Sequence, residues 1–392
     1  MSIKAPLKKY ITANEAVAHA ARLARVDVVA AYPITPQTTI VEKLASFIAN
    51  GEMDADFIKV ESEHSALTAC MGVRMAGARA FTSTSSQGLE YMHEMLAYVS
   101  GGRYPLVLVN VCRSVALPWS IWGDQQDAIQ QRDTGWVQIF TETAQEALDM
   151  VLQAYRIAED HRILLPVMVC LDGFIQSHTE ELVEIPAQES VDAFLLPYDP
   201  VVTLDVDNPY SISVGGFGKH YARWRKEQQE ATEKAKEVIV EVGDEFARLF
   251  GRYYGGLIET YRSQGAQAVI VLMGALTGTA REMVDEMRAQ GKAVGLVKVR
   301  AFRPFPVREV RQALAKVKAA AVLDRDCSWG YEGALATDLK AALYGLPSPP
   351  AVLDFIGGLG GADVPPEQMK YMLDKALAAE KGATPSLEFL GL

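Results

Sequence analysis

Closely spaced cysteines are missing from this sequence of 392 residues. The four cysteines, Cys70, Cys112, Cys170 and Cys327, are far apart, and each lies within or beside an apolar run. Because zinc sites and iron–sulfur clusters are built from clustered thiolates, often in CxxC pairs, we expect this chain to build neither by itself. The natural interpretation is four core thiols in a reducing compartment.

Long apolar runs and an excess of positive charge are also missing. No stretch is apolar over the roughly 20 residues that a membrane-spanning helix needs. The N-terminal residues MSIKAPLKKYITANEA lack the apolar core of a signal peptide. The formal net charge of −11 argues against nucleic acid and against an anionic membrane surface as partners. Together these absences predict a cytoplasmic protein.

Recognisable phosphate-binding and metal-binding motifs are the third absence. The stretch Gly357–Asp363 is rich in glycine, but it fits neither GxGxxG before a helix nor a P-loop, so we interpret it as a tight turn. The six histidines have no metal-ligand spacing, and we expect none of them to be a ligand.

What the sequence does contain is a regular alternation of strand and helix patterns. From Asp27–Ile34 to Leu164–Leu171, short apolar runs alternate about six times with segments of helical periodicity. This spacing predicts an α/β fold with a doubly wound parallel sheet. A second, smaller α/β unit begins near Ala266. We predict an α/β domain with a trailing connection over residues 1–220, a helical linker over 221–264, and the second domain over 265–392.

One candidate site residue, Glu63, lies where the strand pattern of residues 57–61 meets a helix that Ser62 caps. In open α/β sheets ligands bind at such strand ends. A carboxyl group partly buried there, near the second acid Glu61, can have a raised pKa and exchange a proton with a heterocyclic nitrogen. The simpler alternative is an acid that stabilises the first turn of its helix.

Two further candidates follow other predicted strands. Thr35 in YPITPQT is expected to start a helix with Pro36 at its first position, which would present a hydroxyl and free N–H groups to an anion or carbonyl; a plain helix cap is the alternative. Arg113 can hold a carboxylate bidentately, or form a surface ion pair with Asp124 or Asp127. Two tryptophans follow in the same segment, Trp119 and Trp122. They are expected either to line a pocket or to pack in the core, and for Trp122 we favour the core.

Six motifs, in this order, carry a resemblance to a known family: YPITPQT, ESEHSA, TSTSSQGL, RDTGW, KVRAFRPFP and GGLGGADV. Together they resemble the α subunit of the thiamine-diphosphate-dependent 2-oxoacid:ferredoxin oxidoreductases, with the pyruvate type closest, over nearly the whole chain. The resemblance implies that the first domain is the pyrimidine-binding half of a thiamine diphosphate site. It also implies that the second domain is similar to the transketolase C-terminal domain.

The resemblance assigns roles to single residues. Glu63 would bond the aminopyrimidine ring of the cofactor, Thr35 would contact the substrate carbonyl or carboxylate, and Arg113 would hold the carboxylate. The further residues implied are Tyr32, Pro33 and Gln87 at the cofactor and Trp119 at the substrate.

Partners follow from the same resemblance. A β subunit would supply Mg²⁺, the diphosphate contacts and iron–sulfur clusters, beside a γ subunit and a ferredoxin-like δ subunit. Coenzyme A would be the co-substrate, and ferredoxin or another protein the electron acceptor. Two absences from the sequence agree with this division of roles. The chain has no CxxC for a cluster. It also lacks the usual Mg²⁺-diphosphate motif, a GDG followed by an Asn pair, which neither Asp172-Gly173 nor Gly243-Asp244 completes.

The substrate stays open at this stage. Pyruvate is the main expectation, but Trp119 stands where the pyruvate type has a smaller aliphatic residue, which leaves a branched-chain or aromatic 2-oxoacid such as 2-oxoisovalerate or phenylglyoxylate. Thr35 argues against oxalate. Ala362 replaces the arginine of the family's Gly-Gly-Arg-Asp, with a consequence at a subunit contact or near coenzyme A. The alternatives are a thiamine enzyme without electron transfer and a non-catalytic assembly subunit.

Overall fold

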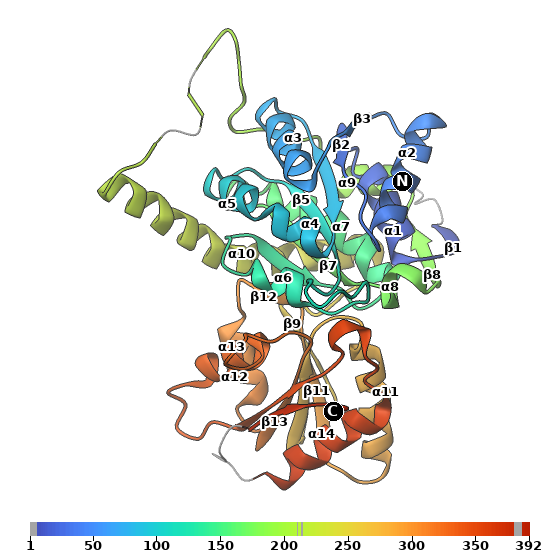
Figure 1. Ribbon diagram of the computed structural model, residues 1–392, viewed down its shortest axis with the longest axis vertical. Coiled ribbons are helices and arrows are strands. Elements are labelled where there is room, and N and C mark those ends of the chain that lie inside the picture. The colour runs from blue at the N-terminus through green and yellow to red at the C-terminus, as the bar shows by residue number, and fades with distance from the viewer. Residues whose placement is uncertain (1–5, 210, 213–214, 380–385) are drawn as a thin grey trace.

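The computed structural model describes residues 6–209, 211–212, 215–379 and 386–392. These residues form two α/β domains, each built on its own sheet, stacked along the long axis of the molecule (Figure 1). No helix in this part of the chain is long and apolar enough to cross a membrane.

The first sheet has seven strands in the order β12-β6-β7-β5-β4-β2-β3, and all neighbours are parallel except β12, which runs antiparallel to β6. This confirms the predicted doubly wound parallel sheet. The chain passes from β2 to β3 on one side and then returns to β4 on the other side of β2. Such a reversal opens a crevice at the carboxyl ends of the strands. The strands are β2 (Val28–Ala31), β3 (Asp56–Lys59), β4 (Ala80–Thr84), β5 (Val107–Cys112), β6 (Val137–Phe140), β7 (Val167–Asp172) and β12 (Ala301–Arg303).

Helices cover both faces of this sheet. Residues of α1, α2 and α7 share one apolar core with one face, and residues of α3, α4 and α5 share a second core with the other face. Side-chain caps define where several of these helices begin. At the start of α1, the Thr12 hydroxyl accepts a hydrogen bond from the Glu15 N–H. At the start of α3, the Ser62 hydroxyl accepts one from the Ser65 N–H at 3.2 Å. The helices are α1 (Ala13–Leu23), α2 (Thr38–Ala49), α3 (Glu63–Met75), α4 (Ser86–Tyr91), α5 (His93–Gly101), α6 (Gln126–Gln130), α7 (Ala144–Ala158), α8 (Ile175–His178) and α9 (Gln188–Phe194).

The start of α2 corrects one expectation. The helix begins at Thr38 rather than at Thr35–Pro36. The Gln37 side chain explains the difference, because its Nε2 donates to Ser83 O at 2.7 Å at the end of β4 and to Tyr32 O at 3.3 Å. These bonds hold residues 32–37 as a turn along the sheet edge, which leaves Thr35 exposed there.

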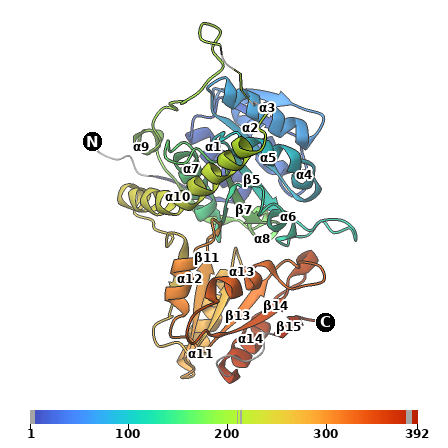
Figure 2. The same ribbon diagram turned by 90° about the vertical axis from the view of Figure 1, so that its left-hand side faces the viewer.

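The region after the first sheet holds more structure than a plain connection. Strand β8 (Glu181–Ile185) pairs antiparallel with β1 (Leu7–Ile11). A single helix, α10 (Lys219–Phe250), packs its second half on α7, while its first turns project beyond the sheet (Figures 1 and 2). Strand β9 (Ile258–Tyr261) then joins the second sheet. We propose the division 1–220, 221–264 and 265–392, with β12 as a segment of the second domain that completes the first sheet.

The second sheet has six strands in the order β15-β14-β13-β10-β11-β9, parallel except for β9. Its strands are β10 (Ala268–Leu272), β11 (Val294–Val299), β13 (Ala319–Asp324), β14 (Ala351–Ile356) and β15 (Ser386–Phe389). Its helices are α11 (Thr277–Ala289), α12 (Val307–Leu314), α13 (Ala334–Leu343) and α14 (Pro366–Ala378), with a 3₁₀ turn at Leu359–Gly361 in the glycine-rich stretch.

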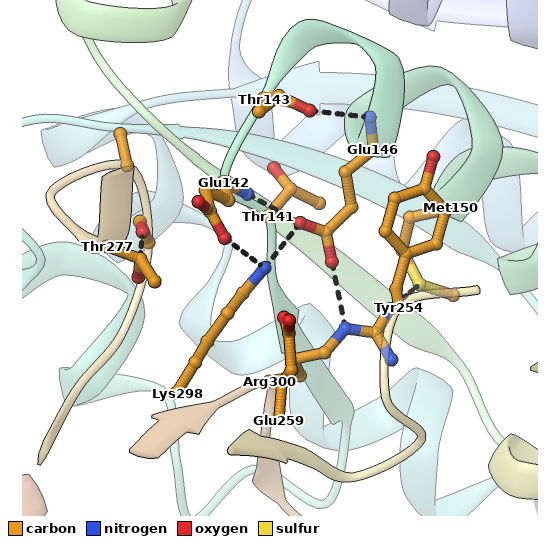
Figure 3. Close-up of polar contacts among 12 residues, drawn as sticks. Thr141, Glu142, Thr143, Glu146, Met150, Tyr254, Glu259, Thr277, Lys298 and Arg300 are labelled. Carbon is orange, nitrogen blue, oxygen red and sulfur yellow. Dashed lines mark hydrogen bonds and ion pairs between the residues drawn. The ribbon is translucent and has the colours of Figure 1, made fainter. Parts of the chain in front are cut away.

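A buried ionic network joins the two domains (Figure 3). Lys298 Nζ at the end of β11 lies 2.6 Å from Glu146 Oε2 and 2.9 Å from Glu142 Oε2. Arg300 Nε adds a contact of 2.8 Å to Glu146 Oε1. Buried charges are costly unless each is paired, and in this network the two cations of the second domain are paired with the two carboxylates of the first.

We expect the substitution Lys298→Met to lower the free energy of unfolding by about 3–5 kcal/mol, because it removes one partner of a buried pair. A matched control is Lys234→Met, which breaks the exposed pair with Glu237 on α10 and should cost less than about 1 kcal/mol. Urea unfolding of the two variants measures the difference. Equal losses would show that the network contributes no more than a surface pair.

Candidate active site

Three of the predicted site residues lie at the carboxyl edge of the first sheet. Thr35 follows β2, Glu63 follows β3, and Arg113 follows β5. The strands β3, β2, β4 and β5 are consecutive neighbours, so the three residues surround the crevice at the reversal of strand order.

Glu63 is the first residue of α3 and is only 8% exposed. Its carboxyl group lies directly against Gly88, where a Cβ would sit 2.6 Å from Oε1, so any side chain at residue 88 would displace this carboxyl group. Burial raises the pKa of Glu63. Glu61 takes no part in this shift: it is exposed, and the Ser65 hydroxyl, 2.5 Å away, lowers its own pKa. The expected influence of Glu61 on Glu63 is therefore wrong, because burial alone raises that pKa.

Several buried polar atoms around Glu63 have no hydrogen-bond partner. Among the described residues, no side chain donates to the Glu63 carboxyl group, and Thr84 Oγ1 and Gln87 Nε2 are buried and unsatisfied. Thr84 Oγ1 also lies beside Gly88, 2.5 Å from where a Cβ would be. Because buried polar groups are rarely left unpaired, these atoms fit a polar ligand bound in the crevice.

Arg113 reaches Thr35 across the crevice. Its Nη1 donates to Thr35 O at 2.8 Å and its Nε to Ser120 O at 3.3 Å, and the side chain is 5% exposed. Within the part of the chain that the structure describes, Arg113 forms no ion pair. The alternative of a surface ion pair with Asp124 or Asp127 is therefore wrong. Burial lowers the pKa of Arg113, so a carboxylate ligand would relieve a desolvated charge.

The remaining predicted residues lie around this crevice with differing exposure. Tyr32 and Pro33 are exposed on the 32–37 turn, and Gln87 Oε1 accepts from the Ser86 hydroxyl at 2.6 Å. Trp119 is 74% exposed on the loop between β5 and α6, which extends from the body beside the domain junction (Figure 2). No contact in the described residues joins Trp119 to Glu63 or Arg113, so its contact with substrate stays a prediction.

Trp122 does not pack in the core as expected. It is 51% exposed, and its ring lies against that of Phe174 with centroids 4.4 Å apart. The physical reason is its place on the loop between β5 and α6, outside both sheets. The second domain contacts only part of the side chain, near Trp122 Cβ, with which a Cβ at Gly361 would collide. Ala362, at the position of the family's arginine, is exposed next to this contact.

The groups that join the carboxyl edges of the two sheets are not among the residues predicted from the sequence. Asp172, the last residue of β7, pairs with Arg325, which follows β13, and accepts from the Ala275 N–H at 2.6 Å. Asp127 was considered only as a surface partner of Arg113, yet it is fully buried. The sequence does contain a signal for both residues. Asp172 and Arg325 lie at the carboxyl ends of strands, which is the same criterion that points to Glu63 and Arg113 as candidate site residues.

Residues 19–244 match the family described as pyruvate flavodoxin/ferredoxin oxidoreductase, thiamine diphosphate-binding, and residues 266–369 match pyruvate:ferredoxin oxidoreductase core domain II. The chain belongs to this oxidoreductase family. The resemblance stated from the motifs is thereby confirmed, and the first match covers the crevice that holds Thr35, Glu63 and Arg113.

Curated relatives of the oxidoreductase family are similar over almost the whole chain. The pyruvate synthase subunit PorA of Methanothermobacter thermautotrophicus is 48% identical over 96% of this chain and 97% of its own length. The ketoisovalerate oxidoreductase subunit VorA of Pyrococcus horikoshii is 50% identical over 94% and 93%. Both are named as subunits.

Two solved structures share the fold. The 2-oxoglutarate:ferredoxin oxidoreductase from Magnetococcus marinus superposes with a TM-score of 0.72 at 18% identity, over 95% of this chain and 66% of that chain. A split-gene transketolase superposes with a TM-score of 0.55 at 14% identity, over 95% of this chain and all of that one. This likeness to transketolase agrees with the predicted fold class.

Proposed function

We propose that this chain is the catalytic α subunit of a cytoplasmic, multisubunit 2-oxoacid:ferredoxin oxidoreductase. The reaction is the oxidative decarboxylation of a 2-oxoacid, with pyruvate the main expectation, to acyl-coenzyme A and CO₂. The observation that carries the proposal is the crevice itself. Among the described residues, the buried Glu63 carboxyl group has no side-chain partner and faces a glycine. The buried Arg113 likewise has no ion pair among them, and it reaches from the end of β5 to the end of β2. The names of the relatives, pyruvate synthase and ketoisovalerate oxidoreductase subunits, support it.

Glu63 has the properties that a pyrimidine-binding carboxyl group needs. When bound, thiamine diphosphate would supply a carbon nucleophile for the 2-oxo group and a ring that acts as electron sink for decarboxylation. Because burial raises the Glu63 pKa, its carboxyl group can share a proton with a ring nitrogen instead of staying fully ionised. Because Gly88 has no side chain, the Glu63 carboxyl group lies directly against it. Thr84, beside the same glycine, and Gln87, the residue before it, each have an unsatisfied buried polar atom.

Arg113 and Thr35 are suited to the other reactant. The Arg113 guanidinium group has donors left after its two backbone bonds and can take a carboxylate in a bidentate arrangement. The exposed Thr35 hydroxyl lies at the same edge and can donate to the 2-oxo or carboxylate oxygen. Arg113 and Thr35 would thus bind and orient the substrate. Tyr32 and Pro33, on the same turn as Thr35, would contact the cofactor.

One active site then requires more than this polypeptide. The chain lacks a GDG motif completed by an Asn pair, so a β subunit would hold the diphosphate and Mg²⁺. Its four separated cysteines leave the iron–sulfur clusters to partner chains, namely the β subunit and a ferredoxin-like δ subunit beside a γ subunit. Coenzyme A would take the acyl group, and ferredoxin or another acceptor the electrons.

The substrate is tested by turnover of the native complex on pyruvate, 2-oxoisovalerate, 2-oxoglutarate and phenylglyoxylate, with coenzyme A and a viologen dye. We expect the highest kcat/KM with pyruvate. Preference for a branched or aromatic 2-oxoacid would instead make the loop of Trp119 the specificity element, since the relatives of both kinds are about equally similar. Absence of turnover on all four would overturn the proposal in favour of a non-catalytic assembly subunit.

A further inference from the structure

Asp127 is the most densely hydrogen-bonded carboxylate near the crevice. It lies in the first turn of α6 and is 0% exposed. Its Oδ2 accepts from the Ser86 N–H at 2.8 Å, the Arg113 N–H at 3.1 Å and Asn110 Nδ2 at 3.1 Å. Its Oδ1 accepts from the Ala128 N–H at 2.7 Å. A single side chain thus binds the backbone after β4 and the backbone after β5.

The Ser86 bond fixes the wall that faces Glu63. Ser86 has φ of +52°, a conformation that residues other than glycine rarely adopt, so it needs support. Asp127 holds its N–H, and Ser114 O accepts its hydroxyl hydrogen bond at 2.5 Å. The bend at Ser86 leads directly to Gly88, two residues on, which lies against the Glu63 carboxyl group.

The Arg113 bond fixes the other side of the crevice. Asp127 holds the backbone of Arg113 where the chain leaves β5, which is the base from which its guanidinium group reaches Thr35. The negative charge of Asp127 also acts on the guanidinium group, because it raises the Arg113 pKa against the effect of burial.

Packing alone does not account for a carboxylate here. No ion pair of Asp127 exists within the described residues, and burial raises its pKa to about 7. Burying a carboxylate without a cation beside it costs free energy, and carboxylates of this kind concentrate at functional sites.

We propose that Asp127 is a positioning residue that sets the Glu63–Gly88 wall and the Arg113 guanidinium group at one fixed separation, through the backbone of Ser86 and Arg113. The inference rests on the proposed function. Asp127 itself touches neither reactant; it acts through the residues that do. A site assembled from separate strand ends gains its rate from such fixed geometry, and small displacements are costly.

The test compares Asp127→Asn with Asp133→Asn, an exposed neighbour, in the native complex. We expect Asp127→Asn to raise the KM for the 2-oxoacid and lower kcat, each by about tenfold, with the KM for coenzyme A unchanged. Hydrogen–deuterium exchange should be faster at the Ser86 and Arg113 amides, and Asp133→Asn should change none of these. An unchanged KM for the 2-oxoacid would overturn the proposal.

Two further variants keep the outcome decisive. If Asp127→Asn does not assemble, Asn110→Ser removes one donor to Oδ2 and should raise the same KM by a smaller factor; no change would again overturn the proposal. Glu63→Gln is measured in parallel. Activity that survives Glu63→Gln contradicts the proposed function, whereas loss there with normal kinetics in Asp127→Asn contradicts only the role of Asp127.

Discussion

Replacing Glu63 by glutamine is expected to reduce turnover of the native complex by about 10²–10⁴-fold, the usual contribution of a positioned acid or base. Glutamine keeps the size of the side chain and its fit against Gly88, but it cannot pass a proton to or from a ring nitrogen. The loss should appear in kcat, because in the proposed site the substrate carboxylate would be held elsewhere, at Arg113. Steady-state kinetics with a viologen dye measure it.

The matched control is Glu61→Gln, two residues away in the bend between β3 and α3. Glu61 is exposed and contacts Ser65, so this variant should keep turnover within about twofold, as surface substitutions usually do. Equal kinetics for the two variants would remove Glu63 from the chemistry. Failure of Glu63→Gln to assemble is not expected, because its carboxyl group has no side-chain partner in the described residues.

Replacing Arg113 by alanine is expected to weaken binding of the 2-oxoacid by about 2–5 kcal/mol, the cost of removing one member of a desolvated charge pair. The KM should therefore rise roughly 30-fold or more. Arg113→Lys should recover part of this loss, because an ammonium group keeps the charge but not the planar fork. The measurement is the KM for each 2-oxoacid beside the KM for coenzyme A.

Arg223→Ala provides a control for the loss of a positive charge. Arg223 lies on the exposed part of α10 and pairs with Glu227, so its removal should leave both KM values unchanged. If Arg113→Ala raised the KM for coenzyme A and not the KM for the 2-oxoacid, Arg113 would bind coenzyme A, which would contradict its proposed role at the substrate carboxylate.

Local signals explain what the sequence predicted well. The Ser62 cap and the strand before it placed Glu63 at the start of α3, and the alternation of strands and helices gave the parallel sheet. Both depend on residues close in the chain.

Long-range contacts explain what it predicted poorly. The start of α2 depends on a bond from Gln37 to Ser83, and the surroundings of Trp122 include Phe174 and, in the other domain, Gly361. Asp127 was misjudged because its partners are backbone N–H groups after two other strands, which no local pattern reveals.

The most direct test of the central claim, that Glu63 acts on a bound thiamine cofactor, is the exchange rate of the C2 proton of thiamine diphosphate in the native complex. It is followed by NMR after transfer to D₂O and quenching. The account predicts that Glu63→Gln slows this exchange by about 10²–10⁴-fold while cofactor occupancy and the Glu61→Gln rate stay as in the unaltered complex. Equal exchange rates at equal occupancy in Glu63→Gln and the unaltered complex would contradict it.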